Sequence, residues 1–239
     1  MDDDKPASEH WRRRLKQLDT MAATATAAVR YGLPAYGARI IVTTGETGIL
    51  TPMTRAILKT AGHTVATLHA PTKGHKWEVQ KELAAVRRKL CDIVIISVPA
   101  HATGLGAMWG LPIAAVAVCE APAASLQAEQ FRTVTKLLTR ARELAVLDIN
   151  GADFVALERS CKADVQTYGD ADLADTRLVV HTHGTHSTTC VVETHDEQVE
   201  FHIPRPEPEA LVAALAAITL ARFYDVDDEL IQSGLFAAK

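Results

Sequence analysis

Short apolar runs alternate along this chain with longer segments in which apolar residues recur at helical spacing. Five runs are predicted as strands: 38–44, 63–70, 91–98, 113–119 and 144–149. Helices are predicted between them, over 52–61, 77–90 and 125–143. The first strand is apolar and β-branched without polar alternation, which is typical of a strand covered on both faces. Strands that alternate with helices predict a mostly parallel α/β sheet flanked by helices.

The pattern changes after residue 163. Four short, β-rich segments follow closely on one another, at 164–169, 176–184, 188–196 and 198–204. Such spacing predicts a small antiparallel β extension, a hairpin or meander attached to the sheet. A proline-containing loop then introduces two further helices, at 210–224 and 226–235.

The chain has 239 residues, which favours one large domain over two. Residues 7–31 have helix-forming composition, so we expect residues 1–37 to form an N-terminal segment with a helix. Residues 38–239 are then expected to form one α/β domain.

Composition and charge exclude several classes of protein. The net charge of -4 gives no general attraction to nucleic acid, and the longest apolar runs, such as 111–119, are too short to span a bilayer. The N-terminus has no signal-peptide pattern, and the four cysteines are irregularly spaced with no CxxC pair. We therefore expect a cytoplasmic protein with reduced thiols and with neither a nucleic-acid nor a membrane partner.

The stretch 40–67 has the outline of a nucleotide-binding element, a buried strand followed by a glycine-bearing turn, a helix and a second strand. Pro52 suits the first turn of that helix, where its missing N–H costs least. Four residues are expected to shape a phosphate loop: Thr44, Gly45, Gly48 and Thr51. Ile49 and Leu50 stand where such a loop carries Lys and Ser or Thr, the groups that neutralise phosphate and bind magnesium.

The order of features along the chain resembles the central domain of the Mur ligase family, especially the MurE-type enzymes, which couple ATP cleavage to amide-bond formation. The resemblance covers roughly 38–235 and rests on an ordered series of segments: TGETGILT (44–51), 79–101, 115–126, 131–138 and 144–153. It implies a Mur-type α/β fold with ATP and magnesium as cofactors. It also implies Lys136 as the metal-bridging lysine and His101 in the place of a conserved histidine, the two candidate catalytic residues.

The departures from this family fall on its chemistry. Ile49 carries no charge, Leu50 binds no metal, and Ser97 occupies the place of a magnesium-binding Glu. The segment 122–126 has no carboxylate or imidazole where the family carries both. Each lost electrostatic group costs roughly 10³-fold or more in rate, so ordinary ligation is not expected.

We therefore expect a catalytically degenerate Mur-ligase-like protein without a cofactor. Its expected role is as a scaffold, partner or ligand-binding subunit in cell-wall or specialised peptide biosynthesis. It is expected to form a homo-oligomer or to pair with an active ligase. The loop 47–53 and the alanine-rich helix 210–224 are the candidate contact surfaces.

Two other hypotheses stay open. The first is an ATP-dependent amino-acid (C–N) ligase with a rebuilt site, which would use ATP and magnesium with Lys136, His101 and either Lys73 or Lys76. The second is a metal-binding protein, because HTHGTH supplies three histidines within six residues: His181, His183 and His186. The same histidines also fit the solvent face of a hairpin.

Overall fold

The computed structural model describes residues 38–70, 78–87, 90–99, 111–119, 125–194 and 197–238. The helix predicted over 7–31 lies outside these residues. Within them, one nine-stranded sheet has the order β2-β3-β1-β4-β5-β6-β7-β8-β9. The fold is α/β, mostly parallel, with antiparallel strands at one end, as predicted.

Six strands form the parallel part of the sheet: β1 (Arg39–Gly45), β2 (Val65–His69), β3 (Ile93–Val98), β4 (Ile113–Cys119), β5 (Leu144–Asp148) and β6 (Asp164–Gly169). Every residue of β3 and of β4 is buried, because helices cover both faces of the sheet. The absence of polar alternation along these strands follows from that double cover.

The antiparallel extension consists of β7 (Thr176–His183), β8 (Thr188–Thr194) and β9 (Glu197–Ile203). Only the first two residues of β7 pair with β6, in parallel. The prediction that 164–169 belongs to the antiparallel extension is wrong, because this segment is β6 and runs parallel to β5. A short helix, α5 (Phe154–Glu158), makes the crossover between β5 and β6, and its five residues are too few to give a periodic pattern.

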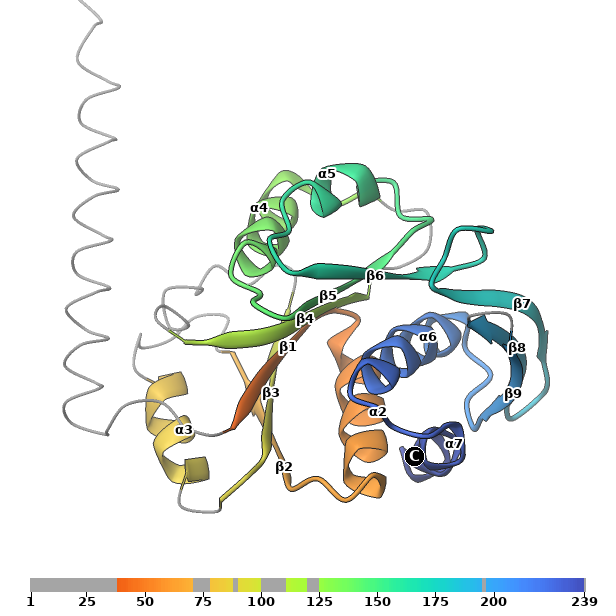
Figure 1. Cartoon of the computed structure of the whole chain (residues 1–239), viewed down its shortest axis with the longest axis horizontal. Helices are drawn as coiled ribbons and strands as arrows, with labels where there is room; N and C mark the ends of the chain where they lie inside the picture. The colour runs from red at the N-terminus through yellow and green to blue at the C-terminus, as the bar shows by residue number, and fades with distance from the viewer. Residues whose placement is uncertain are drawn as a thin grey trace, which may run out of the picture.

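Two hydrophobic cores lie on opposite faces of the sheet. One contains α2 (Thr47–Thr60), α6 (Pro208–Phe223) and α7 (Asp228–Ala237). The other contains α3 (Glu78–Arg87), α4 (Ala128–Leu138) and α5. Figure 1 shows the two helical layers with the sheet between them. No helix among the described residues is long and apolar enough to cross a membrane.

Helix α6 lies inside the first core. Its residues from Ala213 to Ala221 are all buried, because β7, β8 and β9 curve around it while α2 and α7 cover it (Figure 1). The expectation that this alanine-rich helix offers a contact surface is wrong, since its small side chains serve close packing within the chain.

Helix α7 packs directly against the backbone of α2. A Cβ atom added at Gly234 would lie 2.4 Å from the Cα of Ile57, so only glycine permits this approach. At the other side of α7, the Gln232 carboxamide accepts a hydrogen bond from the His202 N–H (2.8 Å) and donates one to the His202 carbonyl (2.9 Å). These contacts fix α7 between α2 and β9.

Helix α2 begins earlier than its proline suggests. It starts at Thr47, so Pro52 lies inside the helix rather than at its beginning. The carbonyl of Glu46 accepts hydrogen bonds from the N–H groups of Ile49 (3.2 Å) and Leu50 (3.1 Å), which closes the first turn immediately after the strand.

Candidate functional site

The carboxyl end of β1 is where the direction of the sheet's connections switches. β1 lies between β3 and β4, and the chain leaves β1 towards β2 on one side and returns to β4 on the other. Open α/β sheets bind ligands in the crevice at such a point, beyond the carboxyl ends of the strands. The four loop residues named from the sequence, Thr44, Gly45, Gly48 and Thr51, lie at this end of β1 and in the first turns of α2.

Gly45 fixes the shape of the turn. Its φ of +91° is in the left-handed region, and a Cβ atom there would lie 1.6 Å from the Cys119 carbonyl oxygen. The same carbonyl accepts a hydrogen bond from the N–H of Glu46 at 2.7 Å. The turn is therefore bound to the end of β4, and no other residue fits at this position.

Hydrogen bonds within the chain already use several groups of the loop. The N–H groups of Glu46, Ile49 and Leu50 are bonded to carbonyl oxygens. The hydroxyl of Thr51 lies 2.7 Å from that of Thr43 in a buried hydrogen bond between α2 and β1. A phosphate-binding loop needs such donors to point at its ligand. Here the N–H groups of Ile49 and Leu50 close the first turn of α2 instead. The Glu46 N–H and the Thr51 hydroxyl join the loop and the helix to the sheet.

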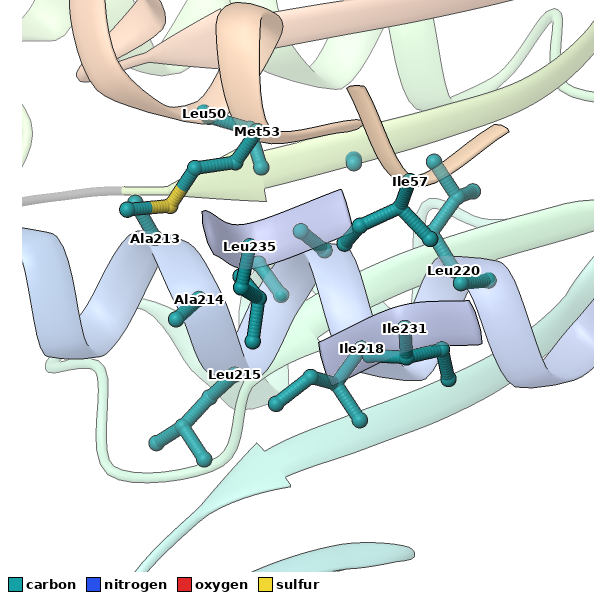
Figure 2. Packing of buried hydrophobic residues seen from close by; sticks show 14 of the residues in the cluster. Leu50, Met53, Ile57, Ala213, Ala214, Leu215, Ile218, Leu220, Ile231 and Leu235 are labelled. Atoms are coloured by element: carbon teal, nitrogen blue, oxygen red, sulfur yellow. The ribbon is translucent and has the colours of Figure 1, made fainter. Parts of the chain in front are cut away.

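Leu50 is a core residue. Its side chain is fully buried and belongs to the same cluster as Met53, Ile57 and residues of α6 and α7. Figure 2 shows Leu50 beside Met53, whose side chain reaches towards Ala213 of α6. Ile49 is partly buried against the same cluster. The expectation that loop 47–53 forms a contact surface is wrong for its apolar residues Leu50 and Met53, which face the interior.

Ser97 lies beside the loop, where the sequence placed it. It pairs in register with Thr43 of β1, is 2% exposed, and its carbonyl accepts a hydrogen bond from Ala70 at 2.8 Å. Because residue 97 is a serine, this position of β3 supplies a hydroxyl group and no carboxylate.

A second polar group lies at the same edge, after β5 and β6. Asn150 donates to Asp170 at 2.6 Å, and its side-chain oxygen accepts the Asp170 N–H at 3.0 Å. The Asn150 N–H is bonded to Asp148 at 2.9 Å. Burial, with a smaller effect from Asp170, raises the pKa of Asp148, although the hydrogen bond from Asn150 opposes the shift. This network holds the ends of β5 and β6 together.

Several solved ligases have the same arrangement of strands and helices. MurF from Acinetobacter baumannii has a TM-score of 0.73 at 15% identity, over 93% of this chain and 50% of that one. A UDP-N-acetylmuramoyl-L-alanyl-D-glutamate–2,6-diaminopimelate ligase has a TM-score of 0.70 at 14% identity, over 85% of this chain and 46% of that one. The fold is that of the Mur ligase central domain.

Folylpolyglutamate synthetase from Lactobacillus casei shares this fold, with a TM-score of 0.70 at 12% identity, over 93% of this chain and 71% of that one. The chain spans about half the length of the two Mur ligases. At these identities the likeness shows the fold alone. No family model matches the chain, and no curated protein matches it in sequence.

In this chain Lys136 lies far from the loop. Lys136 is exposed in the last turn of α4, and the N–H of Arg142 just beyond bonds to Ile113 at the start of β4. Gly45, in contrast, adjoins Cys119 at the other end of this seven-residue strand. The strand is about 20 Å long, so the structure does not bring Lys136 to the loop. His101, Lys73 and Lys76 lie outside the described residues.

The candidate metal ligands lie at the far end of the antiparallel extension. His181 and His183 are exposed on β7 with ring centroids 5.0 Å apart, and His183 Nδ1 lies 2.9 Å from the Thr188 hydroxyl. His186 is exposed in the turn that follows. Across the described part of the chain, no group of three His, Cys, Asp or Glu side chains is arranged to hold a metal ion.

The Asp148, Asn150 and Asp170 network was missed from the sequence. The sequence could have indicated this network through the positions of its residues, because Asp148 ends β5 and Asp170 directly follows β6. Polar residues after neighbouring parallel strands meet at one edge of the sheet, the edge that carries function in this class of fold.

Proposed function

We propose that this chain is a Mur-ligase-like protein that has lost ATP-dependent ligation and now serves as a scaffold, partner or ligand-binding subunit. The observation that carries the proposal is the burial of Leu50. The residue that takes the place of the magnesium-binding hydroxyl is a core side chain. The fold shared with MurF and with folylpolyglutamate synthetase, together with the resemblance of the sequence to Mur ligases, supports a place in cell-wall or specialised peptide (amide-bond) biosynthesis.

The chemistry of the loop supports the loss of ATP use. Ile49 has no charge to offset a phosphate, and the exposed carboxylate of Glu46 at the N-cap of α2 opposes an anion there. Burying a leucine side chain stabilises a fold by about 1.5–3 kcal/mol, so drawing Leu50 out to remodel the loop would cost a comparable amount. ATP and magnesium therefore do not fit the residues present, and no catalytic step is assigned to them.

The remaining parts of the proposal concern assembly. We expect the chain to form a homo-oligomer or to bind an intact Mur ligase. Size-exclusion chromatography with light scattering, on the chain alone and mixed with an intact Mur ligase of the same organism, tests this part. A monomer that does not co-elute with the ligase would contradict it.

Calorimetric titration of the full chain with ATP and magnesium tests the loss of ligation. We expect no magnesium-dependent heat, with an intact Mur ligase in the same buffer as the positive control. Ile49→Lys alone is expected not to restore binding, because the Leu50 position and Ser97 still lack metal ligands. Micromolar, magnesium-dependent binding by the unmodified chain would instead favour a ligase with a rebuilt site.

A further inference from the structure

The strand β2 forms one end of the sheet and has a neighbouring strand on one side only. Among the described residues this neighbour is β3. Figure 1 shows β2 at the outer end of the parallel strands, between α2 and α3. A hollow of about 660 Å³ follows β2 from Val65 to Leu68 and is lined on its two sides by these helices. The residues of β2 thus form the floor of a groove with a helix on each side.

Alternate backbone groups of β2 point away from β3, along the free edge. The Ala70 N–H bonds to the Ser97 carbonyl at 2.8 Å. The Thr64 carbonyl accepts a hydrogen bond from the Asp92 N–H at 2.9 Å, so the even-numbered residues face β3. In a parallel pair the residues between them turn their N–H and C=O groups to the other side. The residues with these outward groups are Val65, Thr67 and His69.

The five residues of β2 carry none of the features that commonly protect a free edge. The sequence VATLH contains no proline and no lysine, and the strand pairs with β3 without a register shift. The side chains of Ala66 and Thr67 are only half-buried, so no close packing covers the edge at its centre. An edge of this kind is a template on which another chain can pair.

The two walls of the groove carry opposite charges. The α2 wall presents Arg55 and Lys59, and the α3 wall presents Glu82 beside Ala85, all of them exposed. Arg55, Lys59 and Glu82 have no ion-pair partner within the described part of the chain. Side chains of an added strand would face the two walls alternately. Charge complementarity therefore favours acidic side chains towards α2 and small, uncharged ones towards α3.

A second copy of this chain fits the groove poorly. Antiparallel pairing of two β2 edges about a two-fold axis would set α2 beside its copy on one face of the sheet and α3 beside its copy on the other. Arg55 would then approach the cations of the other copy, and Glu82 would approach its own equivalent. Such like charges repel one another, so the groove favours a different chain.

We propose that the free edge of β2 binds an extended segment of a partner protein as an additional strand of the sheet. The segment carries Asp or Glu at alternate positions, which pair with Arg55 and Lys59, and small apolar residues between them, which pack against Ala85. The outward backbone groups of β2 supply the hydrogen bonds. This inference rests on the proposed partner role but not on the loss of ATP use, because β3 separates β2 from the strand that carries the loop.

Hydrogen exchange of the isotope-labelled full chain, followed by NMR, tests the proposal. In the dilute free chain we expect the amides of Val65, Thr67 and His69 to exchange fast, and those of Ala66 and Leu68 slowly, because only the latter bond to β3. A capped peptide of alternating Glu and Val, at millimolar concentration, is expected to slow exchange of the first group at least about 10-fold. No slowing by the peptide, or slow exchange already in the dilute free chain, would overturn the proposal. Slowing that grew with chain concentration alone would identify a second copy as the occupant, which would also overturn it.

Modified peptides separate strand pairing from charge attraction alone. N-methylation of only the Glu amides, or of only the Val amides, removes the N–H groups along one edge of the peptide. We expect just one of these two peptides to lose binding, and equal binding by both would contradict strand pairing. A peptide of alternating Lys and Val is expected to bind at least about 10-fold more weakly than the Glu peptide. Equal binding of the Lys peptide would overturn the acidic character of the partner.

Combining Arg55→Glu with Lys59→Glu tests the charged wall. Both side chains are exposed, so we expect the native circular dichroism spectrum to be retained. The double variant is expected to bind the Glu peptide at least about 10-fold more weakly and the Lys peptide more tightly. Lys162→Glu, at an exposed cation that precedes β6, is the matched control and should leave binding unchanged. Unchanged binding by the double variant would overturn the proposed partner chemistry, whereas the outcome of an ATP titration bears only on the proposed loss of ligation.

Discussion

The close approach of α7 to α2 makes Gly234→Ala a sharp test of the packing. The new Cβ atom would lie 2.4 Å from the Cα, 2.8 Å from the N and 2.9 Å from the Cγ1 of Ile57. Two of these three atoms belong to the backbone, so a side-chain rotation does not relieve the clash. To reach ordinary contact distances the helices have to separate by about 1 Å.

The expected cost follows from two opposing effects. Overpacking a well-packed core lowers the free energy of unfolding by about 1–3 kcal/mol. Replacing glycine by alanine within a helix raises it by about 0.5–1 kcal/mol. We expect Gly234→Ala to lower the free energy of unfolding by about 1–2 kcal/mol. For a chain of this size the melting temperature then falls by roughly 5 °C.

Urea unfolding followed by circular dichroism measures this change, and Gly48→Ala provides a matched control. Gly48 is exposed in the first turn of α2, and a Cβ atom there meets nothing within 4 Å. Gly48→Ala is therefore expected to be as stable as the unmodified chain or slightly more stable. If Gly234→Ala behaved like Gly48→Ala, the inferred contact between the helix backbones would be refuted.

Three further outcomes are expected. Gly45→Ala should lower the free energy of unfolding by about 3 kcal/mol or more in urea, because its Cβ would meet the Cys119 carbonyl at 1.6 Å and its φ is +91°; stability like that of the unmodified chain would contradict this. Burial raises the pKa of Cys190 to about 11, so at pH 8 only about one Cys190 thiol in a thousand is ionised. Iodoacetamide should therefore label Cys190 of the native chain slowly until urea is added, and rapid labelling of Cys190 in the native chain would contradict this. Burial, helped by Asp170, raises the pKa of Asp148 in the folded chain, so native stability falls as pH rises from the unfolded pKa through the folded one. Asp148→Asn should therefore be more stable than the unmodified chain at neutral pH and lose this advantage below the ordinary aspartate pKa, as measured by urea unfolding at the two pH values; a constant difference would argue against the shift.

The parallel strands were predictable because burial on both faces leaves its own pattern. β3 and β4 are buried along their whole length and therefore lack polar alternation. The start of α2 was not predictable from Pro52, since the carbonyl of Glu46 nucleates the helix five residues earlier. The burial of α6 depends on strands that curve around it, and its composition alone did not reveal this cover.

In the candidate site too, the features that are local in sequence could be predicted, and those that depend on distant contacts could not. The glycine turn and the replaced Lys and Thr positions are local in sequence, so they could be recognised from a few residues around Ile49. The inward direction of Leu50 could not, because it depends on contacts with α6 and α7.

The two hydrogen bonds between Gln232 and His202 also decide how the sheet ends. β9 is the last strand of the sheet. The Gln232 carboxamide accepts a hydrogen bond from the His202 N–H and donates one to the His202 carbonyl, as a neighbouring strand would. An incoming chain that sought to extend the sheet past β9 would have to displace this side chain and lift α7 away. Gln232 therefore hinders the addition of a further strand at this edge, which is a common route to aggregation.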